Sequence, residues 1–151
     1  LEGDITQKNL GLKTLELSSL IEDLDEIYHA AALTSFDAFP NLYDMVNVEG
    51  TRNILELALI CNRNGKLRKV NHVSTIFVSG DYRGVFAEAN LNVEQKFGTF
   101  YEKSKFKAEK LIENFRSNGL WIDIFRPAII AGELISGRFL NPNQAFYQIL
   151  K

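Results

Sequence analysis

The stretch KVNHVSTIFV, residues 69–78, decides the fold, because it predicts a buried strand. The apolar residues of 48–59 have helical spacing, and Asn64-Gly65 gives that helix a C-terminal stop. A second helix is predicted at about residues 99–117, and it leads to the strand candidate LWIDIFRP, residues 120–127. Strands that alternate with helices at this spacing indicate βαβ units and a mostly parallel sheet.

The remaining segments fit the same pattern. Residues 26–32 predict a short buried strand that runs into a loop of small residues, and residues 12–24 have a loose helical stripe. The other expectations are a loop or broken helix at 36–47, a loop at 81–98, a loop at 132–143 and the start of a helix at 144–151.

The composition is that of an ordinary globular domain. Of 151 residues, 46% are hydrophobic and 24% are charged, which excludes a disordered tail or a fibrous repeat. The formal net charge of −2 gives no electrostatic reason to expect a nucleic-acid partner. No apolar run reaches the roughly 18–20 residues that span a bilayer. Cys61 has no second cysteine for a disulfide or a metal site, so we expect no metal and a cytoplasmic setting.

The helix at residues 99–117 carries the first candidate site. Tyr101 and Lys105 share one helical face, and the apolar stripe of the helix passes through both, while charged residues such as Glu109 mostly occupy the other faces. Lys105 is therefore expected to face the sheet, where an unpaired ammonium would be costly. A nearby cation lowers the pKa of a phenol, which would let Tyr101 exchange protons near neutral pH. The alternative is a core tyrosine beside a lysine whose amine reaches water.

Further polar and small residues lie where strands are expected to end. A hydroxyl of Ser74 or Thr75 is placed to bond a substrate carbonyl, although such hydroxyls also satisfy local backbone groups. The small side chains of Ala30, Ala31 and Ala32, which follow His29, favour either close approach to a flat ligand or tight helix–sheet packing. Asn47 is either the N-cap of the following helix or a polar group of the site.

Taken in chain order, six stretches resemble the extended short-chain dehydrogenases/reductases. They are GDIT at 3–6, DEIYHAAA at 25–32, NVEGT at 47–51, HVST at 72–75, YEKSK at 101–105 and RPA at 126–128. Within that superfamily, the chain is most similar to the branch of thioester reductases and fatty acyl-CoA reductases. The resemblance implies an α/β fold, with a partial Rossmann-like, doubly wound parallel sheet that lacks its first strands.

The resemblance also implies a role for each matching residue. Tyr101 would be the general acid, Lys105 would bind the nicotinamide ribose and tune Tyr101, and Thr75 would bond the substrate carbonyl. The other expected cofactor contacts are Asp4 and Ile5 by the adenine, Ala31 and Ala32 close to the cofactor, Asn47 behind the catalytic centre, and Pro127 and Ala128 at the nicotinamide site.

The implied chemistry is transfer of a hydride from NADPH to the carbonyl of an acyl thioester on a carrier protein or CoA. NADH stays open as the reductant. Tyr101 and Thr75 would stabilise the developing oxyanion, and the hemithioacetal would collapse to a thiol and an aldehyde. The sequence leaves open a further reduction to the alcohol.

The chain departs from the family at the phosphate-binding motif. Gly-x-x-Gly-x-x-Gly, which belongs to the first strand–helix turn, occurs nowhere in the 151 residues. The opening LEGD also reads like the end of a strand. We therefore expect residues 1–151 to be the C-terminal part of an NAD(P)-binding Rossmann domain. The glycine-rich loop and most of the substrate-binding region would lie in further segments, natively joined to these residues. Alone, they should bind NADP(H) poorly and be inactive.

Two other functions stay open. A sugar-nucleotide epimerase or a ketone reductase of the same superfamily would use the same tyrosine and lysine, whereas the apolar Ile76 and Phe77 after Thr75 speak against a dehydratase. A non-catalytic nucleotide sensor or scaffold on the same fold is the second alternative, since a fold alone does not give a function.

Overall fold

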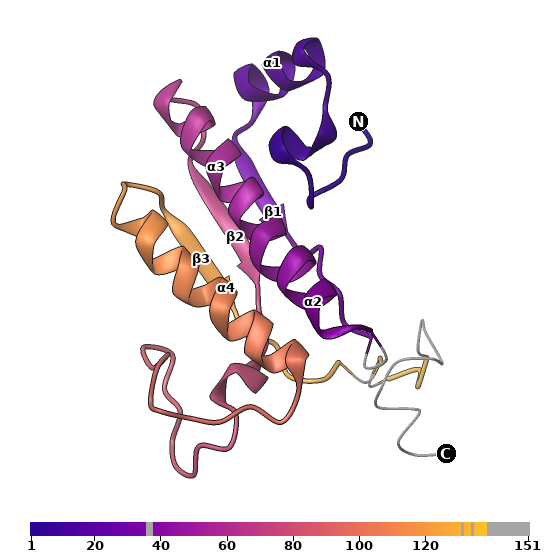
Figure 1. Cartoon of the computed structure of the whole chain (residues 1–151), viewed down its shortest axis with the longest axis vertical. Helices are drawn as coiled ribbons and strands as arrows, with labels where there is room; N and C mark the ends of the chain where they lie inside the picture. The colour runs from indigo at the N-terminus through magenta and orange to yellow at the C-terminus, as the bar shows by residue number, and fades with distance from the viewer. Residues whose placement is uncertain (36–37, 131, 134, 139–151) are drawn as a thin grey trace.

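The computed structural model describes residues 1–35, 38–130, 132–133 and 135–138 (Figure 1). Its elements in chain order are η1 (Lys8–Gly11), α1 (Thr14–Asp23), β1 (Glu26–His29), α2 (Pro40–Tyr43), η2 (Asp44–Glu49), α3 (Gly50–Arg63), β2 (Lys69–Val73), η3 (Ile76–Ser79), α4 (Phe100–Arg116) and β3 (Ile122–Phe125). The helix expected at 144–151 lies outside the described residues, as does half of the loop expected at 132–143.

The three strands form one parallel sheet in the order β1-β2-β3. The register aligns Ile27, Val70 and Ile122 across the strands, and their side chains join the core beneath α3 and α4. These two helices run side by side over one face of the sheet (Figure 1). The alternation of strands and helices thus gives the α/β class with a parallel sheet, as the sequence predicts.

The helix before β2 begins earlier than expected. Helical backbone runs from Pro40 through the π-helical turn η2 to the end of α3 at Arg63. Proline suits a first helical position, because no N–H donor is needed there. The start expected at Val48 is therefore wrong, and residues 40–47 already belong to the helix. The interruption expected in this region is the π-helical turn.

β2 ends at Val73, earlier than the strand end expected at Val78. Thr75 caps the short helix η3, because its hydroxyl accepts a hydrogen bond from the Phe77 N–H at 3.3 Å. A side chain that satisfies a local N–H favours a turn over a continued strand. Ser74 and Thr75 consequently lie just beyond the carboxyl end of the central strand.

A capping box fixes the start of α4. The Thr99 hydroxyl accepts the Glu102 N–H at 3.1 Å, and the Glu102 carboxylate accepts the Thr99 N–H at 3.3 Å. Both bonds satisfy N–H groups that the first turn of a helix leaves without partners. Tyr101 is thereby held in the first turn of α4, close to the end of β2.

Within the described residues, the outer strands β1 and β3 each pair on one side only. On the face away from α3 and α4, Tyr28 and Trp121 are 70% and 71% exposed. No helix in the described part of the chain is long and apolar enough to cross a membrane.

The core makes a direct prediction for Ile112, which is 0% exposed between α4 and the sheet. Ile112→Ala should lower the free energy of unfolding by about 2–5 kcal/mol, because it removes buried methylene groups and leaves a cavity. Ile60→Ala, at a 40% exposed position of α3, should cost less than about 1 kcal/mol. Urea unfolding of both variants checks this, and equal losses would contradict the placement of the core.

Candidate active site

Three of the predicted site residues converge beyond the end of β2. The side chains of Thr75 and Tyr101 share a hydrogen bond. The Lys105 amine donates to the Val73 carbonyl at 2.8 Å and lies 3.4 Å from Nε2 of His72. Lys105 is only 2% exposed, so the prediction that it faces the sheet is confirmed.

The environment raises the pKa of Tyr101, contrary to the expected lowering. Burial is the larger cause because it disfavours the phenolate, and the hydrogen bond from Thr75 opposes it. The Lys105 amine is directed to Val73 and His72 instead. Tyr101 is therefore a protonated phenol at neutral pH and can serve as a proton donor.

The pKa of Lys105 is lowered to about 8, mainly because burial disfavours the ammonium. The negative charge of Glu109, one helical turn further along α4, acts in the opposite direction. Lys105 thus titrates close to the physiological range.

Two histidines lie beneath the Lys105 amine, with ring centres 5.2 Å apart. Burial and the Lys105 charge lower the pKa of His29 to about 4 and that of His72 to about 2. Nε2 of His29 lies 2.9 Å from the Thr51 hydroxyl, which itself donates to the Asn47 carbonyl. Both rings are therefore neutral at pH 7 and place no positive charge against Lys105.

Asn47 is not an N-cap. It is buried inside the π-helical turn η2, and its side chain forms hydrogen bonds with two other segments of the chain. Its side-chain amide accepts the Leu33 N–H at 2.7 Å and donates to the Leu33 carbonyl at 3.0 Å. It also donates to the Ser104 hydroxyl at 2.9 Å. Asn47 therefore ties the loop after β1 to α4, between Tyr101 and Lys105. Such π-helical turns are frequent at functional sites.

Asp4 and Ile5 lie in a turn that packs on α3. The Asp4 carboxylate accepts a hydrogen bond from the Thr6 N–H at 2.9 Å. Hydrogen bonds from Thr6 lower the pKa of Asp4. The Ile5 carbonyl accepts a hydrogen bond from Asn53 at 2.7 Å. A Cβ on Gly50 would come within 2.8 Å of the Ile5 side chain, so the glycine permits this close approach. The contacts described here attach the turn to α3 and not to Thr75, Tyr101 or Lys105.

The other predicted cofactor contacts lie after the ends of β1 and β3. Ala31 is exposed and Ala32 half-buried, in the loop held by Asn47. The Pro127 carbonyl accepts the Ile76 N–H at 3.2 Å, which brings it next to Thr75, and Ala128 is exposed. The carboxyl ends of all three strands thus meet at one edge, as in other open parallel sheets that bind ligands there.

A cluster without a predicted role lies beside this edge. The Ser74 hydroxyl donates to the carboxylate of Glu109, which is 0% exposed, and Arg126 donates to the same carboxylate at 2.7 Å. The sequence offers one signal for it, because Tyr101, Lys105 and Glu109 recur every four residues on one helical face. The prediction that places Glu109 with the charges on the other faces of that helix is wrong.

Comparison with known proteins gives this geometry a family. A family model described as "Male sterility protein", an NAD-binding family, matches residues 1–151. The chain belongs to this family. The expected family, its fold class and its grouping with NAD(P)-dependent reductases of the short-chain type are thereby confirmed.

Individual relatives point the same way. Carboxylic acid reductase of Segniliparus rugosus is 28% identical over 95% of this chain, and the match spans 13% of that protein. Fatty acyl-CoA reductase wat of Drosophila melanogaster is 28% identical over 87% of this chain, which is 23% of its own length. The solved terminal R domain from the myxalamid PKS-NRPS pathway superposes with a TM-score of 0.86 at 32% identity, over 100% of this chain and 38% of that one.

The described residues fit one half of the family's nicotinamide cofactor. The Lys105 ammonium has three N–H donors, and its bond to Val73 leaves others for hydroxyl groups of a ribose. The exposed residues Ala30 and Ala31 offer a surface without bulky side chains. The glycine-rich motif that would bind the pyrophosphate is not in the sequence. Among the described residues, no group of His, Cys, Asp and Glu side chains is arranged to hold a metal ion.

The buried histidines predict a loss of stability in acid. An unfolded histidine has a pKa of about 6.5, so below that pH the unfolded chain binds protons that folded His29 and His72 do not. The free energy of unfolding should fall by about 1.4 kcal/mol per pH unit for each histidine as the pH drops from about 6.5 toward 4. Urea unfolding at a series of pH values measures the slope. His29→Gln should make it shallower, and an unchanged slope would contradict a neutral, buried ring.

Proposed function

We propose that the chain forms the catalytic part of an NADP(H)-dependent reductase of acyl thioesters, carried on CoA or on a carrier protein. The main support is the meeting of Thr75, Tyr101 and the Lys105 amine beyond the end of β2. A fatty acyl-CoA reductase and a terminal R domain among the relatives favour a thioester substrate. The product is an aldehyde, with a second reduction to the alcohol as the alternative.

Thr75 and Tyr101 would act on the carbonyl oxygen of the substrate. The Thr75 oxygen accepts the Phe77 N–H, and its hydrogen, now directed to Tyr101, would turn to the carbonyl oxygen of a bound substrate. Tyr101 has a raised pKa and stays protonated, so its phenol can donate both a hydrogen bond and a proton. Two donors aimed at one oxygen stabilise negative charge as it develops there.

The Lys105 ammonium would hold the ribose of the cofactor and place a positive charge near Tyr101. Once bound, the reduced nicotinamide supplies a hydride to the carbonyl carbon. Tyr101 gives its proton to the oxygen, so that a hemithioacetal results. The C–S bond then breaks as the hydroxyl proton of the hemithioacetal passes to the sulfur, which releases the thiol and leaves the aldehyde, and Tyr101 regains a proton from solvent.

We propose further that residues 1–151 are part of a larger NAD(P)-binding Rossmann domain, in which other segments supply the glycine-rich loop and most of the substrate-binding region. The proposal rests on the motif that this sequence lacks. Cys61, buried and the only cysteine, is compatible with a reducing, cytoplasmic compartment.

The role of Tyr101 is tested by Tyr101→Phe in the complete polypeptide that carries these residues. Loss of the proton donor should lower kcat about 10²–10⁴-fold while NADP(H) binding is kept. Turnover is followed by the absorbance of NADPH, and binding by fluorescence titration. Tyr28→Phe, on the opposite face of the sheet, is the matched control and should leave both values unchanged. A Tyr101→Phe variant with full turnover would exclude this mechanism.

Substrate class separates the reductase from the alternatives. An acyl-CoA or a carrier-bound acyl thioester should consume NADPH and release a thiol that a thiol reagent detects. A UDP-sugar should cause neither change. Conversion of the UDP-sugar without net use of cofactor would favour the epimerase. Binding of NADP(H) with no turnover of any substrate would favour a sensor.

A further inference from the structure

A buried carboxylate, Glu109, lies one helical turn beyond Lys105 and has no part in the chemistry above. Tyr101, Lys105 and Glu109 follow one another at four-residue intervals on α4, so all three belong to the face that packs toward the sheet. Glu109 is 0% exposed. A buried charge is costly unless it is paired, so the Glu109 carboxylate is expected to have partners that compensate its charge.

Glu109 has partners on two strand ends. Nε of Arg126 donates to both carboxylate oxygens, at 3.1 and 3.2 Å, and a terminal guanidinium nitrogen donates to one of them at 2.7 Å. The Ser74 hydroxyl donates to the other carboxylate oxygen of Glu109. Ser74 directly precedes Thr75, and Arg126 directly precedes Pro127. The carboxylate therefore fixes α4 against the chain segments that carry both predicted contacts.

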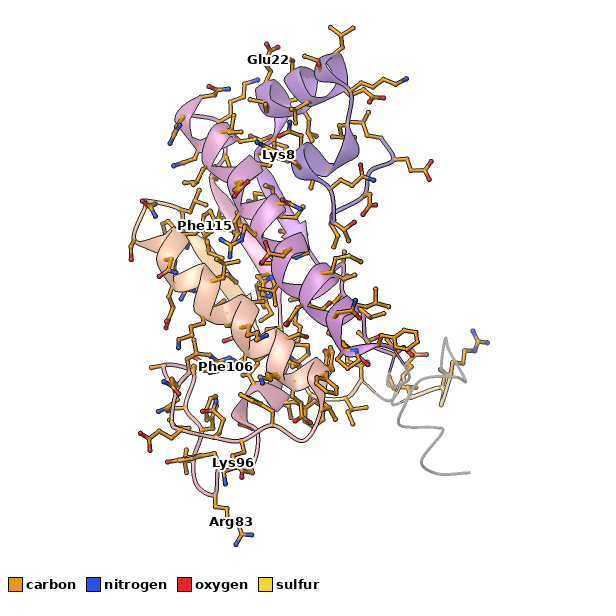
Figure 2. All side chains as sticks on the ribbon, in the orientation of Figure 1. Lys8, Glu22, Arg83, Lys96, Phe106 and Phe115 are labelled. Carbon is orange, nitrogen blue, oxygen red and sulfur yellow. The ribbon has the colours of Figure 1, made fainter. Side chains whose placement is uncertain are left out.

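Arg126 extends this network into residues 80–98, the loop that joins η3 to α4. Its guanidinium donates to the carbonyls of Glu88 at 3.2 Å and Asn90 at 2.9 Å. The ends of the loop meet where the Asp81 N–H donates to the Lys96 carbonyl at 3.0 Å. In Figure 2, Arg83 points away from the body of the molecule at the tip of this loop. Arg126, which directly follows β3, thus anchors the loop that connects Thr75 to Tyr101.

The charges around the Lys105 amine are few. His29 and His72 on the sheet are neutral, and Tyr101 on α4 is protonated. Asp44 in η2 is paired with Lys107. Arg126 is paired with Glu109. Burial lowers the Lys105 pKa to about 8, and the charge of Glu109 is what opposes that lowering.

We propose that Glu109 is a positioning residue of the site: with Ser74 and Arg126 it holds Thr75 next to Tyr101, and it places a negative charge one helical turn from Lys105. The catalytic meaning of this inference rests on the proposed function, whereas its electrostatic part does not. Glu109 touches neither substrate nor cofactor in this scheme and acts through Lys105 and Ser74.

The electrostatic part is tested without turnover. The Lys105 side chain is titrated by NMR of its ε-carbon in the complete polypeptide and in its Glu109→Gln variant. The variant should titrate at lower pH, because burial then acts without the opposing negative charge. Glu113→Gln removes an exposed carboxylate from the same helix and should leave the midpoint unchanged. An unchanged midpoint in Glu109→Gln would overturn the proposal.

If near-ultraviolet circular dichroism shows that Glu109→Gln does not fold, the titration is carried out on the double variant Glu109→Gln/Arg126→Gln. It carries neither buried charge, so no unpaired guanidinium is left. Its Lys105 midpoint should also be lower than in the parent protein, and an equal midpoint would count against the inference.

The catalytic part is tested by the pH dependence of kcat. Glu109→Gln should lower kcat about 10–100-fold, because small displacements of reacting groups carry losses of that size. It should also move the alkaline limb to lower pH. Ser74→Ala keeps the carboxylate and should lower kcat without moving that limb. A loss of kcat in Glu109→Gln with the limb unmoved would leave only a structural role and overturn the proposal.

These readouts separate the two hypotheses. A shifted NMR midpoint in a protein without reductase activity would exclude the proposed function and leave the electrostatic role of Glu109 standing. Reductase activity that depends on Tyr101, together with an unchanged midpoint, would exclude the inference alone.

Discussion

The site depends on the burial of one ammonium group. Lys105 lies under the end of the central strand, where it donates to the Val73 carbonyl and touches a neutral histidine. A cation in such a place must be compensated, and here a strand carbonyl, an imidazole nitrogen and the charge of Glu109 do so. The helix that carries Lys105 also carries Tyr101 and Glu109, so the position of the amine sets those of both neighbours.

Buried polar groups join the helices to the sheet at this edge, whereas apolar packing joins them further along. Asn47 binds both backbone groups of Leu33 and the Ser104 hydroxyl, so three separate chain segments meet in one side chain. Glu109 links α4 to the residues that directly follow β2 and β3 in a comparable way. Hydrogen-bonded networks of this kind demand a single arrangement, since each unmade bond leaves a desolvated group. That requirement gives the strand ends the fixed geometry that a catalytic site needs.

Much of the fold could be predicted from the sequence, because hydrophobic periodicity reports local structure. The strands near residues 26, 70 and 122 and the helix bearing Tyr101 are in the expected places. The errors lie where polar side chains override that pattern. Thr75 ends β2 by capping η3, and Asn47 sits within a helix because its amide is used by Leu33. A pattern of apolar residues contains no information on such hydrogen bonds.

The same limit applies to the site. The spacing of Tyr101 and Lys105 places both on the inner face of α4, yet it suggests a depressed phenol pKa where burial in fact raises it. The sequence predicts an outer face for Glu109 because charged residues are usually solvated. Its partners, Ser74 and Arg126, are 35 and 17 residues away along the chain, so only the folded arrangement reveals the pairing. Pairing between residues far apart in the chain offsets the cost of burying the Glu109 charge and holds the strand ends together. The sequence shows that such a charge would be costly to bury, but it does not show which groups pair with it.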